Sequence, residues 1–185
     1  MNKTLDKLLR KLRYRYFLPY IKDNSIFVDI GCGDEAVFLN QVSPKISEGV
    51  GLDKFSGDRI IGNIRLLSAN VEKEIPLSDD YADYVSMLAV LEHLNHPEAV
   101  IKEANRILKK NGLLFITVPT PVSKPVLEFM AFKLKIIDQF QIADHKKYWW
   151  KKETVALLEK CGFKVIKASY FQFIFNTRII AKRCN

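Results

Sequence analysis

Cysteine and long apolar runs are both scarce in this sequence, and each shortage excludes a class of protein. The 185 residues include three cysteines, Cys32, Cys161 and Cys184, which are too few and too scattered for a disulfide framework or a cysteine zinc site. No apolar run approaches the roughly 20 residues that cross a bilayer. Charge interrupts the first residues, MNKTLDKLLRKLRYRYF, so we expect no signal peptide. These shortages favour a protein of a reducing, cytoplasmic compartment.

Acidic residues are also in the minority, with 21 Asp and Glu against 29 Lys and Arg and a formal net charge of +8. The excess is concentrated in residues 1–22, which hold seven Lys or Arg and one Asp. Large apolar residues recur between these charges at helical spacing, which predicts a basic amphipathic helix that ends near Pro19. Such a helix can pack on the sheet, cover a ligand or lie on a membrane surface as a peripheral contact. These alternatives stay open.

The remaining residues, 23–185, are expected to form one domain, because 185 residues with 48% hydrophobic content match an ordinary globular domain. Residues 119–148 are expected to form an insert in it. Expected strands cover 25–30, 48–53, part of 58–69, 82–88, 112–119, 163–170 and 177–183, and expected helices cover 34–43, 97–110 and 151–163. This alternation predicts an α/β fold, with a parallel sheet covered on both faces.

The stretch VDIGCGD places Gly31 and Gly33 directly after a predicted strand that contains Asp29. Ala36 completes the pattern G-x-G-x-x-A, which is typical of nicotinamide or flavin dinucleotide sites. A dinucleotide would place its pyrophosphate over this turn, where Asp29 and the acidic residues 34–35 add negative charge. S-adenosylmethionine carries an ammonium and a sulfonium but no phosphate, so it removes the conflict and is the expected cofactor.

Asp53 supports a nucleoside cofactor of either kind. It ends the next predicted strand, GVGLD, and lies 20 residues past Gly33. A carboxylate at this point can accept hydrogen bonds from both ribose hydroxyls. Asp53 therefore indicates an adenosine, and the surroundings of Asp29 favour S-adenosylmethionine over a dinucleotide.

With these motifs the chain resembles the class I S-adenosylmethionine-dependent methyltransferases, of the bacterial type that acts on small molecules, sugars or lipids. The matching segments run in the family's order from about residue 26 to 163: VDIGCGD, GLD, SANVEKEIPLSDDYADYVSML, VLEHL, EANRILKKNGLLFITVP and LLEKCGF. The resemblance implies a Rossmann-like three-layer sandwich. Its seven-stranded, mostly parallel sheet would have an antiparallel last strand.

The resemblance also implies which residues bind the cofactor. Asp29 and the backbone of residues 31–33 would flank the methionine part, Asp53 the ribose, and the Leu88 carbonyl the ammonium. Where the family usually has an acid against adenine, this chain has Asn70, whose carbonyl can still accept from the adenine amino group. The implied cofactor-binding residues are Asp29, Gly31, Cys32, Gly33, Asp53, Asn70, Val71 (through its backbone) and Leu88.

Two histidines are candidates for catalysis. Methyl transfer is an in-line displacement that depends on alignment, and it needs a general base only where the acceptor loses a proton. His93 follows the strand predicted over 82–88. With Glu92 it makes only two ligands, so no metal site is expected. His145 is the other candidate for a base or an acceptor-binding group, because the adjacent Asp144 can raise its basicity.

The expected acceptor is a small, glycan or lipid-linked molecule methylated on oxygen. Apolar residues in 126–140 exceed what one helix face buries, so this stretch and residues 1–22 are expected to form a partly apolar, partly cationic lid over the acceptor. Charge alone favours an RNA methyltransferase, but without an RNA-binding module or aromatic platform nucleic acid is not the expected partner. A cofactor-binding regulatory subunit without catalysis is the other alternative. The sequence predicts neither the acceptor atom nor the oligomeric state.

Overall fold

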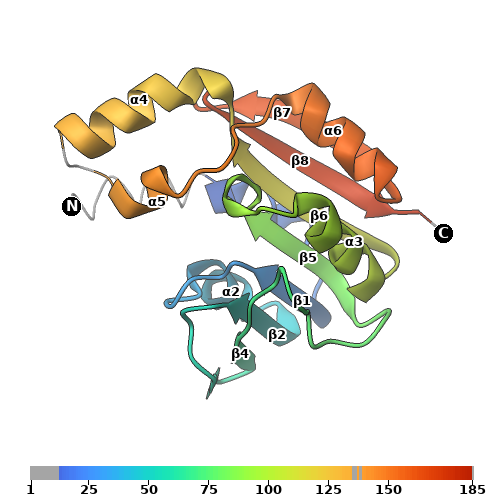
Figure 1. Ribbon diagram of the computed structural model, residues 1–185. Coiled ribbons are helices and arrows are strands. Elements are labelled where there is room, and N and C mark those ends of the chain that lie inside the picture. The colour runs from blue at the N-terminus through green and yellow to red at the C-terminus, as the bar shows by residue number, and fades with distance from the viewer. Residues whose placement is uncertain (1–12, 135–136, 138, 185) are drawn as a thin grey trace.

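The computed structural model describes residues 13–134, 137 and 139–184, so most of the predicted basic helix lies outside the described residues. The described strands form one sheet between two layers of helices (Figure 1). The strands are β1 (Ser25–Ile30), β2 (Ile46–Asp53), β3 (Arg59–Ile61), β4 (Ile64–Ser68), β5 (Ala82–Leu88), β6 (Leu108–Pro119), β7 (Phe163–Phe171) and β8 (Asn176–Arg183). The helices are η1 (Leu18–Tyr20), α2 (Val37–Val42), η2 (Leu91–His93), α3 (Pro97–Ile107), η3 (Pro121–Ser123), α4 (Lys124–Glu128), η4 (Phe129–Lys133), α5 (Gln139–Ala143) and α6 (Lys151–Lys160).

The eight strands follow the order β3-β4-β2-β1-β5-β6-β8-β7. Strands β4, β2, β1, β5 and β6 are parallel, and the last strand, β8, is inserted antiparallel between β6 and β7. The expected Rossmann-like α/β sandwich is thus confirmed. The strand beyond the expected seven is β3, which pairs antiparallel with β4. Gly62 has a φ of 58° between them, a conformation that suits glycine, so the segment predicted as one strand is a hairpin.

All three predicted helices are shorter in the structure, α6 at its end and the other two for reasons that the backbone shows. In the helix predicted over 34–43, Ala36 adopts a left-handed conformation with φ 42°. Helix α2 therefore begins only at the next residue, and the acidic residues 34–35 lie in the preceding turn. In the helix predicted over 97–110, Leu108 already pairs with β5. Asn111, with φ 65°, consequently turns the chain within β6 and does not cap α3.

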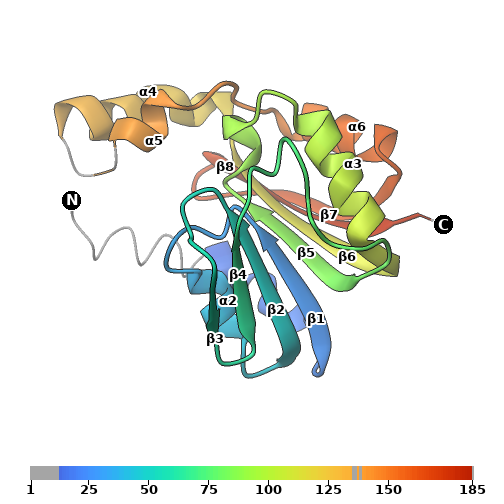
Figure 2. The ribbon, with the colours of Figure 1, turned by 60° about the horizontal axis from the view of Figure 1, so that its bottom comes forward.

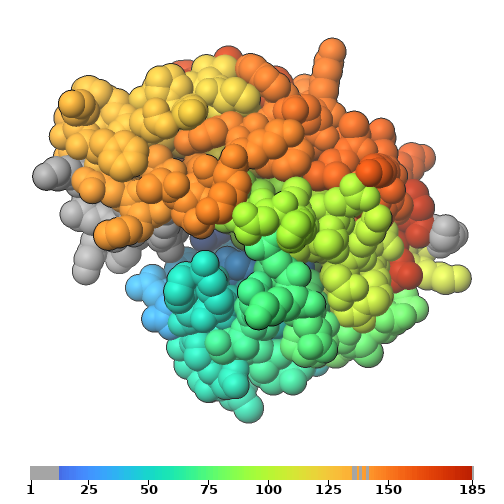
Figure 3. All heavy atoms as spheres, viewed as in Figure 1, coloured from blue at the N-terminus to red at the C-terminus, as the bar shows by residue number. Residues whose placement is uncertain are grey.

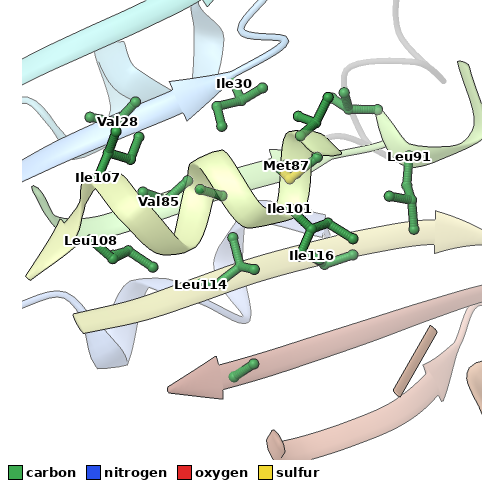
Figure 4. Packing of buried hydrophobic residues seen from close by; sticks show 14 of the residues in the cluster. Val28, Ile30, Val85, Met87, Leu91, Ile101, Ile107, Leu108, Leu114 and Ile116 are labelled. Atoms are coloured by element: carbon green, nitrogen blue, oxygen red, sulfur yellow. The ribbon is translucent and has the colours of Figure 1, made fainter. Parts of the chain in front are cut away.

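Side chains of the central strands point alternately into two apolar cores, one on each face of the sheet. Figure 4 shows the first core, in which Ile101 and Ile107 of α3 lie over Val85 and Met87 of β5. The second core lies beneath α2 and includes Phe27 of β1. The two layers of helices follow from this alternation, and Figure 2 shows them on opposite faces of the twisted sheet.

The described end of the N-terminal segment belongs to the second core. Phe17 is fully buried, and its ring stacks on Phe115 of β6 with 4.9 Å between centroids. Tyr14 stacks in the same way on Phe38 of α2 at 4.8 Å. Residues 14–21 therefore pack on the sheet. The rest of the N-terminal segment, on which the expected membrane contact and its share of the lid depend, lies outside the described part of the chain. Among the described residues, no helix is long and apolar enough to cross a membrane.

A single carboxylate caps the start of α6. The Glu153 Oε2 atom accepts a hydrogen bond from the Trp150 backbone N–H at 2.8 Å, so it satisfies one of the free donors of the helix N-terminus. Replacing Glu153 with alanine is expected to lower the free energy of unfolding by about 1 kcal/mol. Urea denaturation measures this loss. The matched control Glu159→Ala, near the other end of the helix, is expected to change it by less than about 0.5 kcal/mol, and equal losses in both variants would contradict the capping role.

Candidate active site

Two glycines build the turn between β1 and α2. Gly31 and Gly33 have φ values of 74° and 68°, which side chains rarely adopt. A Cβ atom on Gly31 would also lie 2.4 Å from Cγ2 of Val90. The corresponding position on Gly33 has no atom within 4 Å. The turn therefore presents bare backbone to open space at the carboxyl end of the strands, where open α/β sheets bind ligands.

The carboxylate of Asp53 connects this turn to the end of β2. Its Oδ2 atom accepts the Gly33 N–H at 2.9 Å, and its Oδ1 atom accepts the Phe55 N–H at 2.9 Å. A carboxylate has about four lone-pair sites, so the Asp53 oxygens can accept two more hydrogen bonds. This free capacity, beside the open space at Gly33, fits the two hydroxyls of a ribose.

Asp29 lies beneath the turn and is almost completely buried, with 4% of its surface exposed. Ser86 of β5 donates a hydrogen bond to its Oδ1 atom at 2.5 Å. Burial raises the pKa of Asp29 to about 7, the Ser86 hydrogen bond opposes that rise, and the charge of Asp53 adds to it. A positively charged ligand beside this carboxyl would stabilise its ionised form, which is the property expected of an S-adenosylmethionine site.

The other implied cofactor-binding residues differ in how well they fit their roles: Cys32, Asn70, Val71 and Leu88. The Cys32 thiol donates to the Gly33 carbonyl at 3.3 Å, and burial raises its pKa, so it is not a reactive thiol. Leu88 ends β5 at the same edge as Asp29, and the half-buried Val71 packs against the first core. Asn70 is exposed, and its side-chain oxygen accepts the Glu72 N–H at 3.1 Å. One lone pair of the oxygen expected to receive the adenine amino group is therefore used in a turn, and the second stays available.

A second group of polar side chains gathers where η2 meets the chain that returns from α5. His93 Nδ1 lies 3.1 Å from Oδ2 of Asp144, and the rings of His93 and His145 lie 4.8 Å apart between centroids. The Glu92 carbonyl accepts the Lys146 N–H at 2.7 Å, which holds the two segments together. We call Glu92, His93 and His145 the histidine–glutamate cluster.

Burial controls the ionisation of this cluster. It raises the pKa of Glu92 to about 7. It lowers the pKa of His93, although Asp144 opposes that change. Burial and then the charge of His93 lower the pKa of His145 to about 4. The charge of Asp144 does raise the pKa of the adjacent His145, as expected, but burial and His93 outweigh it, so the net pKa falls. At neutral pH both imidazoles are neutral and keep a lone pair for a ligand or a proton.

The comparison that decides the family covers most of the chain: a family model described as a methyltransferase domain matches residues 1–168. The chain belongs to this family. It is a class I S-adenosylmethionine-dependent methyltransferase, and S-adenosylmethionine is its cofactor, as the sequence motifs indicated. The carboxylates and open glycine turn described above fit such a cofactor. They offer acceptors for its hydroxyls and cationic groups, and it has no phosphate for the carboxylates to repel.

Curated relatives are similar over part of the methyltransferase only. The ubiquinone/menaquinone biosynthesis C-methyltransferase UbiE of Vibrio parahaemolyticus is 35% identical over 79 residues, which cover 43% of this chain and 29% of the relative. The enzyme with the same name from Chromobacterium violaceum is 30% identical over 112 residues, which cover 58% and 45%. The chain therefore spans less than half the length of either relative.

Solved structures share the whole fold at low identity. The putative methyltransferase in a complex with the Haloferax volcanii Trm112 methyltransferase activator matches with a TM-score of 0.79 at 15% identity, over 99% of this chain and 95% of that one. A SAM-dependent methyltransferase from Archaeoglobus fulgidus matches with a TM-score of 0.73 at 23% identity, over 95% and 93%. At these identities the likeness shows the fold alone.

Proposed function

We propose that this methyltransferase transfers a methyl group to an oxygen of a partly apolar, lipid-linked small acceptor. The observation that carries the proposal is an exposed apolar surface on the segment that leads back to the histidine–glutamate cluster. Phe129 and Phe132 of η4 are 54% and 46% exposed, and the chain continues through α5 to Asp144 and His145. Figure 3 shows a hollow between this part of the molecule (yellow and orange) and the turns after β1 and β2 (blue and cyan).

The polar cluster offers what an acceptor hydroxyl requires. The Nδ1 atom of His145 is buried and has no hydrogen-bond partner among the described residues. A neutral imidazole of this kind can accept a hydrogen bond or a proton from a hydroxyl as the methyl group arrives. Most of the acceleration would come from holding donor and acceptor in line, and the apolar surface would supply binding energy away from the reacting atom.

C-methylation of a quinone-type ring is the second candidate, and the names of the similar C-methyltransferases favour it. Both candidates use an apolar acceptor, but they differ in the bond formed. The test incubates the protein and methyl-labelled S-adenosylmethionine with a phenol that carries a prenyl chain and a free ring position, and locates the new methyl group by NMR. A methoxy product supports O-methylation, whereas a ring methyl supports the second candidate and overturns the first. Turnover of RNA alone would overturn both.

Removing one apolar side chain of η4 is expected to weaken acceptor binding without slowing the chemistry. Phe129→Ser and Phe132→Ser should each raise KM for a prenylated acceptor by about 10-fold, since burying one phenyl group contributes about 1.5–3 kcal/mol, and should leave kcat within about twofold. Steady-state kinetics with a chain-free acceptor provide the control, because its KM should not change. The exposed Phe173 of the β7–β8 turn gives a matched variant, Phe173→Ser, with no expected effect. Equal changes with both acceptors would contradict the role of this surface.

A further inference from the structure

We propose that the histidine–glutamate cluster is a binding site for a single divalent transition-metal ion, with Glu92, His93 and His145 as its ligands. One ligand atom from each residue lies within 4.8 Å of the other two. The sequence indicated only the first two ligands and therefore no metal. Folding adds the third, because the chain returns from α5 and the Lys146 N–H bonds the Glu92 carbonyl at 2.7 Å.

The carboxylate of Glu92 provides the independent observation that points to an ion. Glu92 is almost completely buried, because only 2% of its surface is exposed, and its Oε2 atom has no hydrogen-bond partner among the described residues. Burying a carboxylate oxygen that lacks a partner is costly unless a charge or hydrogen bond compensates. A backbone hydrogen bond of Glu92 and, to a smaller extent, the charge of Arg13 lower the pKa of Glu92, and burial outweighs both. A cation coordinated at Oε2 would compensate directly.

The hydrogen bond between Asp144 and His93 gives the site an outer partner. The Nδ1 atom of His93 lies 3.1 Å from the Asp144 carboxylate, which leaves its Nε2 atom for the cluster. A carboxylate that orients a metal-binding histidine through its other ring nitrogen is the usual arrangement in protein metal sites. His145 offers its unpartnered Nδ1 atom, so each imidazole has one ring nitrogen left for the cluster.

Two imidazoles and one carboxylate define the class of metal. Such a set suits Zn²⁺, Fe²⁺ or Mn²⁺ better than Ca²⁺ or Mg²⁺, which prefer oxygen ligands. Ligand bonds of about 2.1 Å in a tetrahedral site place ligand atoms roughly 3.5 Å apart. The distances between the three ligand atoms must therefore shorten by about 1 Å when the ion binds. Three protein ligands leave a fourth position open. That position would take the acceptor oxygen and lower its pKa, so in the metal-loaded protein the ion would replace His145 as the group that activates the hydroxyl. This role rests on the proposed O-methylation, whereas metal binding itself does not.

Calorimetric titration of the metal-free protein with Zn²⁺ tests the site, and Co²⁺ serves as a spectroscopic probe. The wild type is expected to bind one Zn²⁺ per chain. Glu92→Gln and His145→Asn should each weaken binding by about 100-fold, and Asp144→Asn by about 10-fold through the orientation of His93. The matched control is His96→Asn, which removes the third histidine of the chain from an exposed position and should change nothing.

Bound Co²⁺ should give the intense visible bands of a four- or five-coordinate site in the wild type, a result that needs no variant. Absence of Zn²⁺ binding below about 1 mM, or equal binding by wild type and His145→Asn, would overturn the proposal. Binding of S-adenosylhomocysteine by each variant shows that the fold and cofactor site are intact. Metal binding without O-methylation would refute the proposed acceptor chemistry only, so the two failures are distinguishable.

Discussion

Replacement of Asp53 with alanine is expected to weaken binding of S-adenosylhomocysteine by about 100-fold. The variant loses the two ribose hydrogen bonds that the Asp53 carboxylate is placed to accept, and hydrogen bonds to a charged group contribute about 1.5–3 kcal/mol each. It also releases the N–H groups of Gly33 and Phe55, which Asp53 accepts at 2.9 Å. The glycine turn should therefore lose part of its order. Calorimetric titration of wild type and variant measures the effect.

Asp34 supplies the matched control for this experiment. It follows the same glycine turn, but its side chain is 67% exposed and pairs with Arg59. Such a surface pair contributes about 0–1 kcal/mol, so Asp34→Ala removes the same charge and should change the affinity by less than about threefold. NADH titrated in parallel should not bind, because the acidic surroundings disfavour a pyrophosphate. Equal losses in the two variants, or tighter binding of NADH, would refute the assignment of Asp53.

The cofactor side of the site could be predicted because its signals are local. A carboxylate at a strand end, two glycines and a second strand-end carboxylate occur within 25 residues, from Asp29 to Asp53, and parallel strands bring their carboxyl ends to one edge. The start of α2 could not be predicted, because a left-handed alanine at position 36 is rare. The role of Asn70 stays a prediction, because Asx side chains often bond their own backbone and here the oxygen accepts the Glu72 N–H but keeps a second lone pair.

The histidine–glutamate cluster could not be predicted because it is assembled over a long range. His145 lies 52 residues beyond His93, and no periodicity connects them. The adjacency of Asp144 and His145 indicated only the smaller effect, since burial outweighs the charge of Asp144 on His145, and the Asp144 carboxylate contacts His93. The burial of Glu92 also follows from tertiary structure alone. The only local signal was its place directly after a central strand.

The ligand-free protein is expected to lose stability between pH 5 and pH 8 through Asp29. Burial raises the pKa of this residue from 3.8 to about 7. Over this range the folded state holds a proton that the unfolded state has released, so the free energy of unfolding falls as pH rises. Two pH units between 5 and 7 correspond to about 2.5 kcal/mol. Glu92, with a pKa raised to about 7, acts in the same direction, and the lowered pKa values of His93 and His145 act in the opposite direction below about pH 6.5.

A comparison with Asp29→Asn isolates the contribution of this carboxyl, because the other groups titrate alike in both proteins. Urea denaturation at pH 5 and pH 8 should show that the variant loses about 2.5 kcal/mol less than the wild type. The asparagine side chain that this substitution introduces can still accept the Ser86 hydrogen bond. The control Asp34→Asn should keep the wild-type dependence, because Asp34 is exposed. A wild-type dependence retained in Asp29→Asn would mean that the buried carboxyl does not carry this titration.

The same carboxyl links proton release to cofactor binding. A cofactor with an ammonium and a sulfonium favours the ionised form of Asp29, so binding should expel the proton that about half of the ligand-free molecules hold at pH 7. The affinity for S-adenosylmethionine should therefore rise with pH through about 7 and level off above it. Calorimetry in buffers of different ionisation enthalpy measures the protons released, and Asp29→Asn should release fewer. The burial of Asp29 destabilises the ligand-free protein at neutral pH, and the same burial makes the cofactor site selective for a cation.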